Sequence, residues 1–113
     1  MEVSILGVAY KIETHKREDD PKIDGGADGY VDTSAKLIVV EDFPKEPLAK
    51  ADLKAYAKQV IRHEIVHAFL FESGIDSSSL QYDGAWATNE ELIDWIAIQA
   101  PKLMRAFQEC DSL

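Results

Sequence analysis

The chain has a single cysteine, Cys110, among its 113 residues. One thiol excludes an internal disulfide framework and a zinc site built from several cysteines. Long apolar runs are also lacking: runs such as residues 37–40 and 68–71 are far shorter than the roughly 20 residues that cross a bilayer. The first residues, 1–7, show no basic segment ahead of an apolar stretch, so they do not indicate a signal peptide. We therefore expect a cytoplasmic protein that does not enter the membrane.

Basic residues are scarce. Lys and Arg number 12 against 21 Asp and Glu, which gives a formal net charge of −9. A surface that binds nucleic acid needs clustered Lys and Arg, so this balance argues against direct nucleic-acid binding. The acidic residues are scattered, apart from a dense patch at 18–20, and this distribution favours a solvated surface.

Apolar residues are plentiful, at 46% of the chain. A chain of this length and composition is large enough for one hydrophobic core. The sequence therefore predicts a single folded domain over residues 1–113. No internal repeat or low-complexity segment divides it.

The first 40 residues predict strands. Residues 2–12 alternate apolar and polar side chains, which indicates a first strand, and the polar residues 15–29 indicate a loop. Residues 30–40 predict a hairpin with its turn at 32–35. The unbroken apolar run at 37–40 indicates either a strand buried on both faces or an edge strand lying over the core.

Two helices are predicted in the second half. Residues 48–73 lack Gly and Pro, and Gly74 provides a C-terminal stop. The apolar stretch 60–71 indicates that this helix enters the interior. After a turn-rich connection over 76–87, a final helix is predicted from Thr88, with Thr88 as N-cap and Glu91 closing a capping box. We expect a kink or restart at Pro101.

The most specific signal is His63-Glu64-Ile65-Val66-His67. On a helix, residues four apart share a face, so both imidazoles can reach one metal ion. Glu64 leaves the helix at a different angle and is placed to accept a proton from a water beside the metal. A glutamate in the apolar stretch would be costly to bury without a cation, which supports a metal there. The pattern therefore indicates a zinc hydrolase site.

A catalytic zinc ion takes three protein ligands and a water. Glu90 is the preferred third ligand, because Glu91 is assigned to the capping box. Asp94 follows Glu90 by one helical turn and is placed to accept the free ring N–H of a zinc-bound histidine. Other residues that remain candidates for the third ligand are His15, Asp19, Asp20, Asp83, Glu91 and Asp94 itself.

His63-Glu64-Ile65-Val66-His67, on what we call the motif helix (residues 48–73), is followed by Asn89-Glu90-Glu91-Leu92-Ile93-Asp94. Together these two segments resemble the gluzincin pattern HExxH…NExxxD. Over residues 30–97 the chain is similar to small bacterial and phage metallopeptidases of the ImmA/IrrE type. The resemblance implies an α+β, zincin-like fold, in which a small mixed or antiparallel sheet packs on the motif helix and on a C-terminal helix that carries the ligand glutamate.

For function, the resemblance implies a zinc metallopeptidase. In it, His63, His67 and Glu90 hold Zn²⁺, Glu64 is the general base, and Asp94 orients a histidine. It also implies a protein or peptide substrate, such as a transcriptional repressor.

An oxyanion donor is usually required as well. Tyr82 is a candidate for this role, with Tyr30 and His15 as weaker ones. Trp86 and Trp95 are expected to anchor the core.

Two other functions stay open. The first is a non-catalytic domain of zincin fold that binds a partner through an edge strand. The second is a metal-dependent hydrolase that acts on bonds other than peptide bonds.

Overall fold

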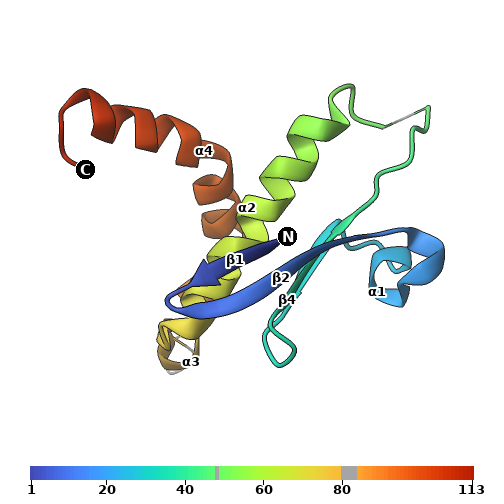
Figure 1. The fold of residues 1–113 in the computed structure, drawn as a ribbon, viewed down its shortest axis with the longest axis horizontal. Coiled ribbons are helices and arrows are strands. Elements are labelled where there is room, and N and C mark those ends of the chain that lie inside the picture. The colour runs from blue at the N-terminus through green and yellow to red at the C-terminus, as the bar shows by residue number, and fades with distance from the viewer. Residues whose placement is uncertain (48, 80–83) are drawn as a thin grey trace.

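The computed structural model describes residues 1–47, 49–79 and 84–113. A four-stranded mixed sheet packs against two long helices, α2 and α4 (Figure 1), which confirms the predicted α+β class. The elements along the chain are β1 (Glu2–Ile5), β2 (Val8–His15), the 3₁₀ turn η1 (Arg17–Asp19), α1 (Pro21–Asp24), β3 (Gly29–Asp32), β4 (Leu37–Glu41), α2 (Leu53–Glu72), α3 (Ile75–Ser79), the 3₁₀ turn η2 (Trp86–Thr88) and α4 (Glu90–Glu109).

The strand order in the sheet is β1-β2-β4-β3. β1 and β2 are antiparallel, β2 and β4 are parallel, and β4 and β3 are antiparallel. The predicted hairpin at residues 30–40 is confirmed as β3 and β4. Its turn is held by the Asp32 carboxylate, which accepts hydrogen bonds from the backbone N–H groups of Ser34 and Ala35.

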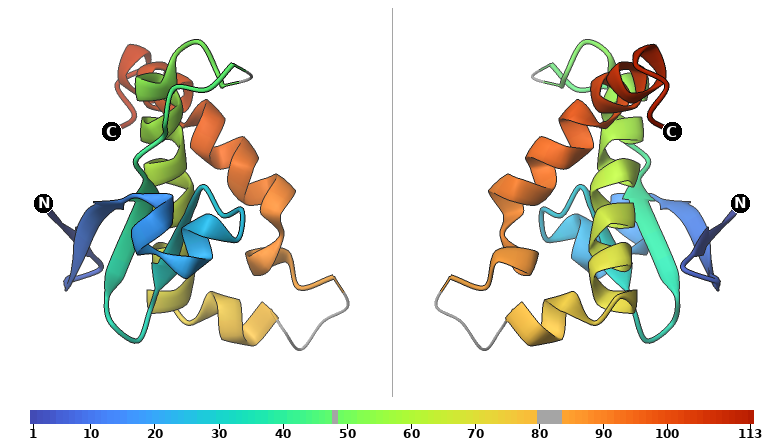
Figure 2. Two further views of the ribbon diagram at one scale, coloured as in Figure 1. Left: turned by 90° about the vertical axis from the view of Figure 1, so that its right-hand side faces the viewer. Right: turned by 90° about the vertical axis from the view of Figure 1, so that its left-hand side faces the viewer.

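β4 lies inside the sheet, so the edge-strand interpretation of residues 37–40 is wrong and the alternative of a strand buried on both faces is correct. The edge position next to β4 belongs to β3. α2 lies across one face of the sheet, against β1, β3 and β4. Figure 2 shows α1 on the opposite face. The buried core between the sheet and α2 contains Ile5, Tyr10, Ile38 and Ala68.

α2 begins at Leu53, five residues after the predicted start. The Asp52 side chain caps it by accepting a hydrogen bond from the backbone N–H of Ala55 at 2.9 Å. A side-chain acceptor at this position satisfies one of the free N–H groups of the first turn. The helix ends at Glu72, and Gly74 follows with a φ of +78°. Glycine adopts this left-handed conformation without a steric penalty, so the predicted stop is confirmed.

α4 begins at Glu90, capped by Asn89, whose side chain accepts from the backbone N–H of Leu92 at 2.9 Å. The prediction of Thr88 as N-cap is therefore wrong. Since Glu91 is the second residue of the helix, it cannot close a capping box from the third. The ribbon of α4 changes direction partway along, and its last turns point away from the sheet (Figure 1). Pro101 lies inside this helix, as expected for a kink.

Other local predictions differ from the structure. Residues 2–12 form a hairpin rather than one strand, because Leu6 and Gly7 both adopt positive φ, +50° and +85°. Two such residues form the tight turn that suits the twist of a hairpin. The predicted loop at 15–29 contains η1 and α1, and the connection at 76–87 contains α3 and the start of η2.

Both tryptophans lie at the surface instead of anchoring the core. Trp86 is 48% exposed and Trp95 is 53% exposed. Among the described residues, no helix is both long enough and apolar enough to cross a membrane.

Candidate metal centre

His63, His67 and Glu90 form a compact group of potential metal ligands across two helices. His63 and His67 project from α2 one turn apart, and Glu90 comes from the first residue of α4. Nε2 of His63 lies 3.1 Å from Nε2 of His67. The Glu90 carboxylate lies 2.9 Å from Nε2 of His63 and 3.0 Å from Nε2 of His67. One potential ligand atom from each of the three residues thus lies within 4.8 Å of the other two.

The spacing of these atoms fits a metal ion. Zinc lies about 2.0–2.2 Å from nitrogen and oxygen ligands, so tetrahedral geometry places two ligand atoms roughly 3.3 Å apart. The two Nε2 atoms are 3.1 Å apart, close to this value, and each of them has a different Glu90 oxygen at 2.9 or 3.0 Å. Two imidazoles and one carboxylate also match a ligand set known for catalytic zinc, which leaves the fourth position free for water.

Asp94 fixes the orientation of His63. Its Oδ1 accepts a hydrogen bond from Nδ1 of His63 at 2.6 Å. With the ring proton on Nδ1, Nε2 of a neutral imidazole has its lone pair available for a metal. Asn89 affects the site indirectly. It is the N-cap of α4, so it determines where this helix begins and therefore where Glu90 and Asp94 lie.

Burial lowers the pKa of His67 below its ordinary value, and this effect outweighs the opposing charge of Glu90. A neutral imidazole is the form that binds a metal. The state of His67 therefore suits the role of a ligand.

Glu64 is the least exposed carboxylate of this region, at 6% exposure. Among the described residues no group donates a hydrogen bond to it, and Nε2 of His63 is 4.0 Å from its Oε1. Burial, assisted by the charges of Glu90 and Asp94, raises the pKa of Glu64 to about 7, although His63 opposes the shift. Among the described residues no side-chain nitrogen or oxygen is fully enclosed without a hydrogen-bond partner, so the Glu64 carboxylate keeps contact with the open space beside it. A cation in that space would favour its ionised form.

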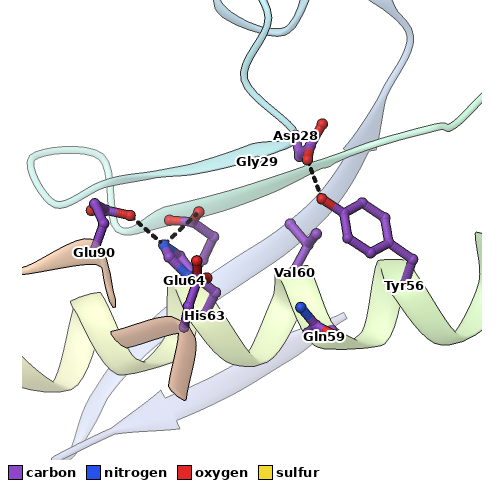
Figure 3. A pocket seen from close by; sticks show the side chains of 9 residues that line it. Asp28, Gly29, Tyr56, Gln59, Val60, His63, Glu64 and Glu90 are labelled. Carbon is purple, nitrogen blue, oxygen red and sulfur yellow. Dashed lines mark hydrogen bonds and ion pairs between the residues drawn. The ribbon is translucent and has the colours of Figure 1, made fainter. Parts of the chain in front are cut away.

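A cavity of about 270 Å³ opens beside this group, between β3 and α2. Figure 3 shows His63, Glu64 and Glu90 towards one end and the pair of Asp28 and Tyr56 towards the other. The Tyr56 hydroxyl donates a hydrogen bond to the Asp28 carboxylate. The other residues that line the cavity are Gly29, Gln59, Val60 and Asp94.

Gly29 lets β3 approach α2 closely at this cavity. A Cβ atom at this position would lie 2.7 Å from Cγ1 of Val60 and 2.8 Å from the carbonyl oxygen of Val39. It would also lie 3.5 Å from Cγ of Glu64. Any larger residue would therefore push the edge of the sheet away from the motif helix.

Several candidates from the sequence lie elsewhere. The Tyr30 hydroxyl donates to Oδ2 of Asp20 at 2.6 Å, and Nδ1 of His15 contacts the same oxygen at 2.7 Å. Tyr30 and His15 are thus engaged away from the cavity, whose lining contains neither. Asp20 is 6% exposed, and its side chain is the N-cap of α1. The interpretation of Asp20 as a solvated loop residue is therefore wrong. Tyr82 and Asp83 lie outside the described residues.

Asp28, Tyr56 and Gln59 line the cavity but were not candidates from the sequence. Helical periodicity could have indicated Tyr56 and Gln59, because they precede His63 by seven and four residues and share its face of α2. Asp28 has no such signal, since its position depends on how β3 pairs with β4 and packs on α2.

Comparisons with known proteins identify no relative. No protein-family model matches the chain, and neither a curated protein nor a solved structure does. The function is therefore inferred from the site itself.

Proposed function

We propose that the protein is a zinc-dependent peptidase that hydrolyses peptide bonds of a protein or peptide substrate. The observation that carries this proposal is the position of Glu64. It is 6% exposed and has no hydrogen-bond donor among the described residues, and it lies beside three residues whose potential ligand atoms are within 4.8 Å of one another.

In this proposal His63, His67 and Glu90 hold Zn²⁺, and Asp94 keeps His63 in the correct tautomer. When bound, zinc lowers the pKa of a water and polarises the scissile carbonyl. Glu64 accepts a proton as the water oxygen bonds to the carbonyl carbon. It then gives the proton to the leaving nitrogen as the carbon–nitrogen bond breaks, so the products are a carboxylic acid and an amine.

The edge of β3 is suited to holding the substrate. Glu41 N–H donates to the carbonyl of Asp28 at 2.8 Å, and Gly29 is the next residue in register, opposite Val40. Hydrogen-bonded and non-bonded pairs alternate in antiparallel strands, so the N–H and C=O of Gly29 point away from β4. An extended peptide that pairs with these groups would run along the cavity, beside Glu64. This role belongs to β3 and not to the buried strand β4.

The substrate class and the family follow from the sequence resemblance to gluzincins of the ImmA/IrrE type. We propose a protein substrate, such as a transcriptional repressor, that presents an extended segment to β3. Such a substrate fits an open strand edge better than a small molecule does.

The test is zinc analysis together with the Glu64→Gln variant. The purified protein should bind one zinc per chain, and zinc-loaded protein should cleave an unstructured protein such as casein. Glu64→Gln should keep the zinc and lose activity by about 10²- to 10⁴-fold, the usual contribution of a general base. Cleavage that persists in Glu64→Gln, or a protein that takes up no zinc, would overturn the proposal.

One observation also favours the non-catalytic alternative. The exposed backbone edge of β3 can bind a peptide without any metal chemistry. In that case a peptide would bind with equal affinity to the wild-type protein and to Glu64→Gln, and zinc-loaded wild-type protein would leave it intact.

A further inference from the structure

The cavity beside the metal centre has an excess of negative charge. Four carboxylates line it: Asp28, Glu64, Glu90 and Asp94. Among the described residues that line it, none is Lys or Arg. Asp28, Glu90 and Asp94 are exposed to solvent, and with a divalent cation bound the four carboxylates would keep a formal charge of −2. Glu64, 6% exposed and without a hydrogen-bond donor among the described residues, faces this same space.

The charges lie at two separate places. Glu64 and Glu90 lie beside His63, whereas Asp28 lies towards the other end, beside Tyr56 (Figure 3). Asp94 contacts Nδ1 of His63 and so belongs to the first group. Tyr56 precedes His63 by seven residues on α2, which corresponds to about 10 Å along the helix. A divalent ion held by His63, His67 and Glu90 is therefore too far from Asp28 to compensate it directly.

Two basic residues share a neighbouring hollow with Asp28 and Tyr56, and both contact other groups. Nζ of Lys50 lies over the ring of Tyr56, 4.6 Å from its centroid. Arg17 pairs with Glu41 and Glu46. Neither cation lines the cavity of the metal centre, where Asp28 is an exposed carboxylate that accepts a hydrogen bond from Tyr56.

We propose that this cavity is a specificity subsite for an arginine or lysine side chain of the substrate, with Asp28 binding its cationic end. The inference deepens the proposed peptidase function and rests on it for the nature of the ligand. A peptide paired with the Gly29 edge would direct alternate side chains to one face. A long basic side chain near the scissile bond could then extend along Val60 and Gln59 to Asp28. Its methylene groups would contact Val60, and its charge would reach the carboxylate.

The first test measures binding and does not require catalysis. The probe is N-acetyl-arginine amide, and its uncharged control is N-acetyl-citrulline amide, which has nearly the same shape. We expect the arginine probe to shift the backbone amide NMR signals of Gly29 and Gln59. It should bind about tenfold or more tightly than the citrulline probe, the ratio that one charge-assisted hydrogen bond supplies. Equal binding of both probes, or shifts confined to other surfaces, would overturn the inference.

Three variants separate recognition from structure. Asp28→Asn keeps an oxygen that can accept from Tyr56 but removes the charge, so the preference for arginine over citrulline should disappear. Tyr56→Phe removes the hydrogen bond and leaves the charge, so the preference should persist. Asp24→Asn removes an exposed carboxylate of α1 that does not line the cavity, and it should change nothing. If Tyr56→Phe abolishes the preference as fully as Asp28→Asn does, the Asp28 charge is not the recognition element.

The second test uses zinc-loaded protein and a series of peptides in which one arginine occupies each position in turn. Cleavage should be fastest with arginine at one position near the scissile bond, and Asp28→Asn should lose this preference. Cleavage without such a preference would refute the subsite and leave the peptidase function standing. Arginine-selective binding without any cleavage would refute the peptidase function and leave a cation-binding cavity.

Discussion

At the scale of single residues, Asp94 is the clearest link between geometry and chemistry. Oδ1 of Asp94 lies 2.6 Å from Nδ1 of His63, and this contact directs Nε2 of His63 towards His67 and Glu90. Without it, the His63 ring can rotate or adopt the other tautomer, and both changes remove a lone pair from the metal position.

We therefore expect Asp94→Asn to weaken zinc binding by about 10- to 100-fold, the usual effect of removing a partner that orients a ligand. Competition with a chromophoric zinc chelator measures this affinity. The control is Glu91→Gln, which removes a neighbouring carboxylate of the same helix turn that does not belong to the ligand group. Equal losses in the two variants would indicate a general effect of charge instead of the contact with His63.

Asp20 is the second residue whose contacts have a measurable consequence. It accepts hydrogen bonds from the Tyr30 hydroxyl and from His15, and these contacts lower the pKa of Asp20 from 3.8 to about 2. The stability that this carboxylate contributes is therefore present above pH 3.8 and is lost as the pH falls through about 2. The hydrogen bond between Asp20 and His15 also changes the pKa of His15. Together with Glu13, Asp20 raises this pKa above 6.5. That contribution is present below pH 6.5 and is lost as the pH rises through the raised value.

The Asp20→Asn variant should accordingly be less stable near neutral pH, and its stability should fall less between pH 4 and pH 2 than that of the wild type. Thermal unfolding followed by circular dichroism across this range measures the effect. Asp19→Asn is the matched control, since Asp19 is adjacent and exposed. If the stability of Asp20→Asn fell between pH 4 and pH 2 as much as that of the wild type, the lowered pKa of Asp20 would not be the cause of the acid destabilisation.

At the scale of elements, the start of α4 decides where Glu90 and Asp94 lie. Asn89 accepts from the N–H of Leu92, whereas the Thr88 hydroxyl donates to the carbonyl of Ala85. Both residues are good N-caps, and they are neighbours in the chain. Sequence preference alone could not choose between them.

Replacing the cap tests this assignment. Asn89→Ala should lower the free energy of unfolding by about 0.5–2 kcal/mol and weaken zinc binding, because the first turn of α4 carries Glu90. Thr88→Ala should cost less and leave zinc binding unchanged. Denaturant titration and zinc competition measure the two quantities. A larger loss from Thr88→Ala would restore Thr88 as the cap.

The elements that the sequence predicted correctly have strong local signals. The motif helix lacks Gly and Pro over its length, and the hairpin of β3 and β4 has a turn rich in polar residues. The turn at Leu6-Gly7 was missed because leucine is rarely found at positive φ. The parallel pairing of β2 with β4 could not be predicted from the sequence, because it joins residues that are distant in the chain and produces no periodic pattern. For the same reason Asp28 could not be related to His63, although they line one cavity.

Pro101 illustrates how two elements become connected. Proline has no N–H, so the carbonyl of Ala97, four residues earlier, lacks its helical donor. Arg62 of α2 donates its Nε–H to this carbonyl instead. The kink in α4 thus provides an acceptor that fixes α4 against the motif helix.

At the scale of the whole molecule, the described residues connect α2 and α4 through three sets of polar contacts, two of which involve the metal centre. They are the pair of Arg62 with the Ala97 carbonyl, the pair of His63 with Asp94, and the contact of both histidines with Glu90. A zinc ion held by His63, His67 and Glu90 would join the two helices directly. It binds only where the folded chain brings these helices together, so its binding energy adds to the stability of the fold.

The final prediction follows from this linkage. At a free zinc concentration of 100 times Kd, the gain in unfolding free energy is about 2.7 kcal/mol, which for a domain of this size raises Tm by about 10 °C. Differential scanning calorimetry with added zinc, and then with excess chelator, should show this rise and its reversal. His67→Ala, which removes one ligand, should show little or no rise. If zinc raised the Tm of His67→Ala as much as that of the wild type, the ion would be binding elsewhere. Zinc would then not stabilise the fold by joining α2 and α4 at this site.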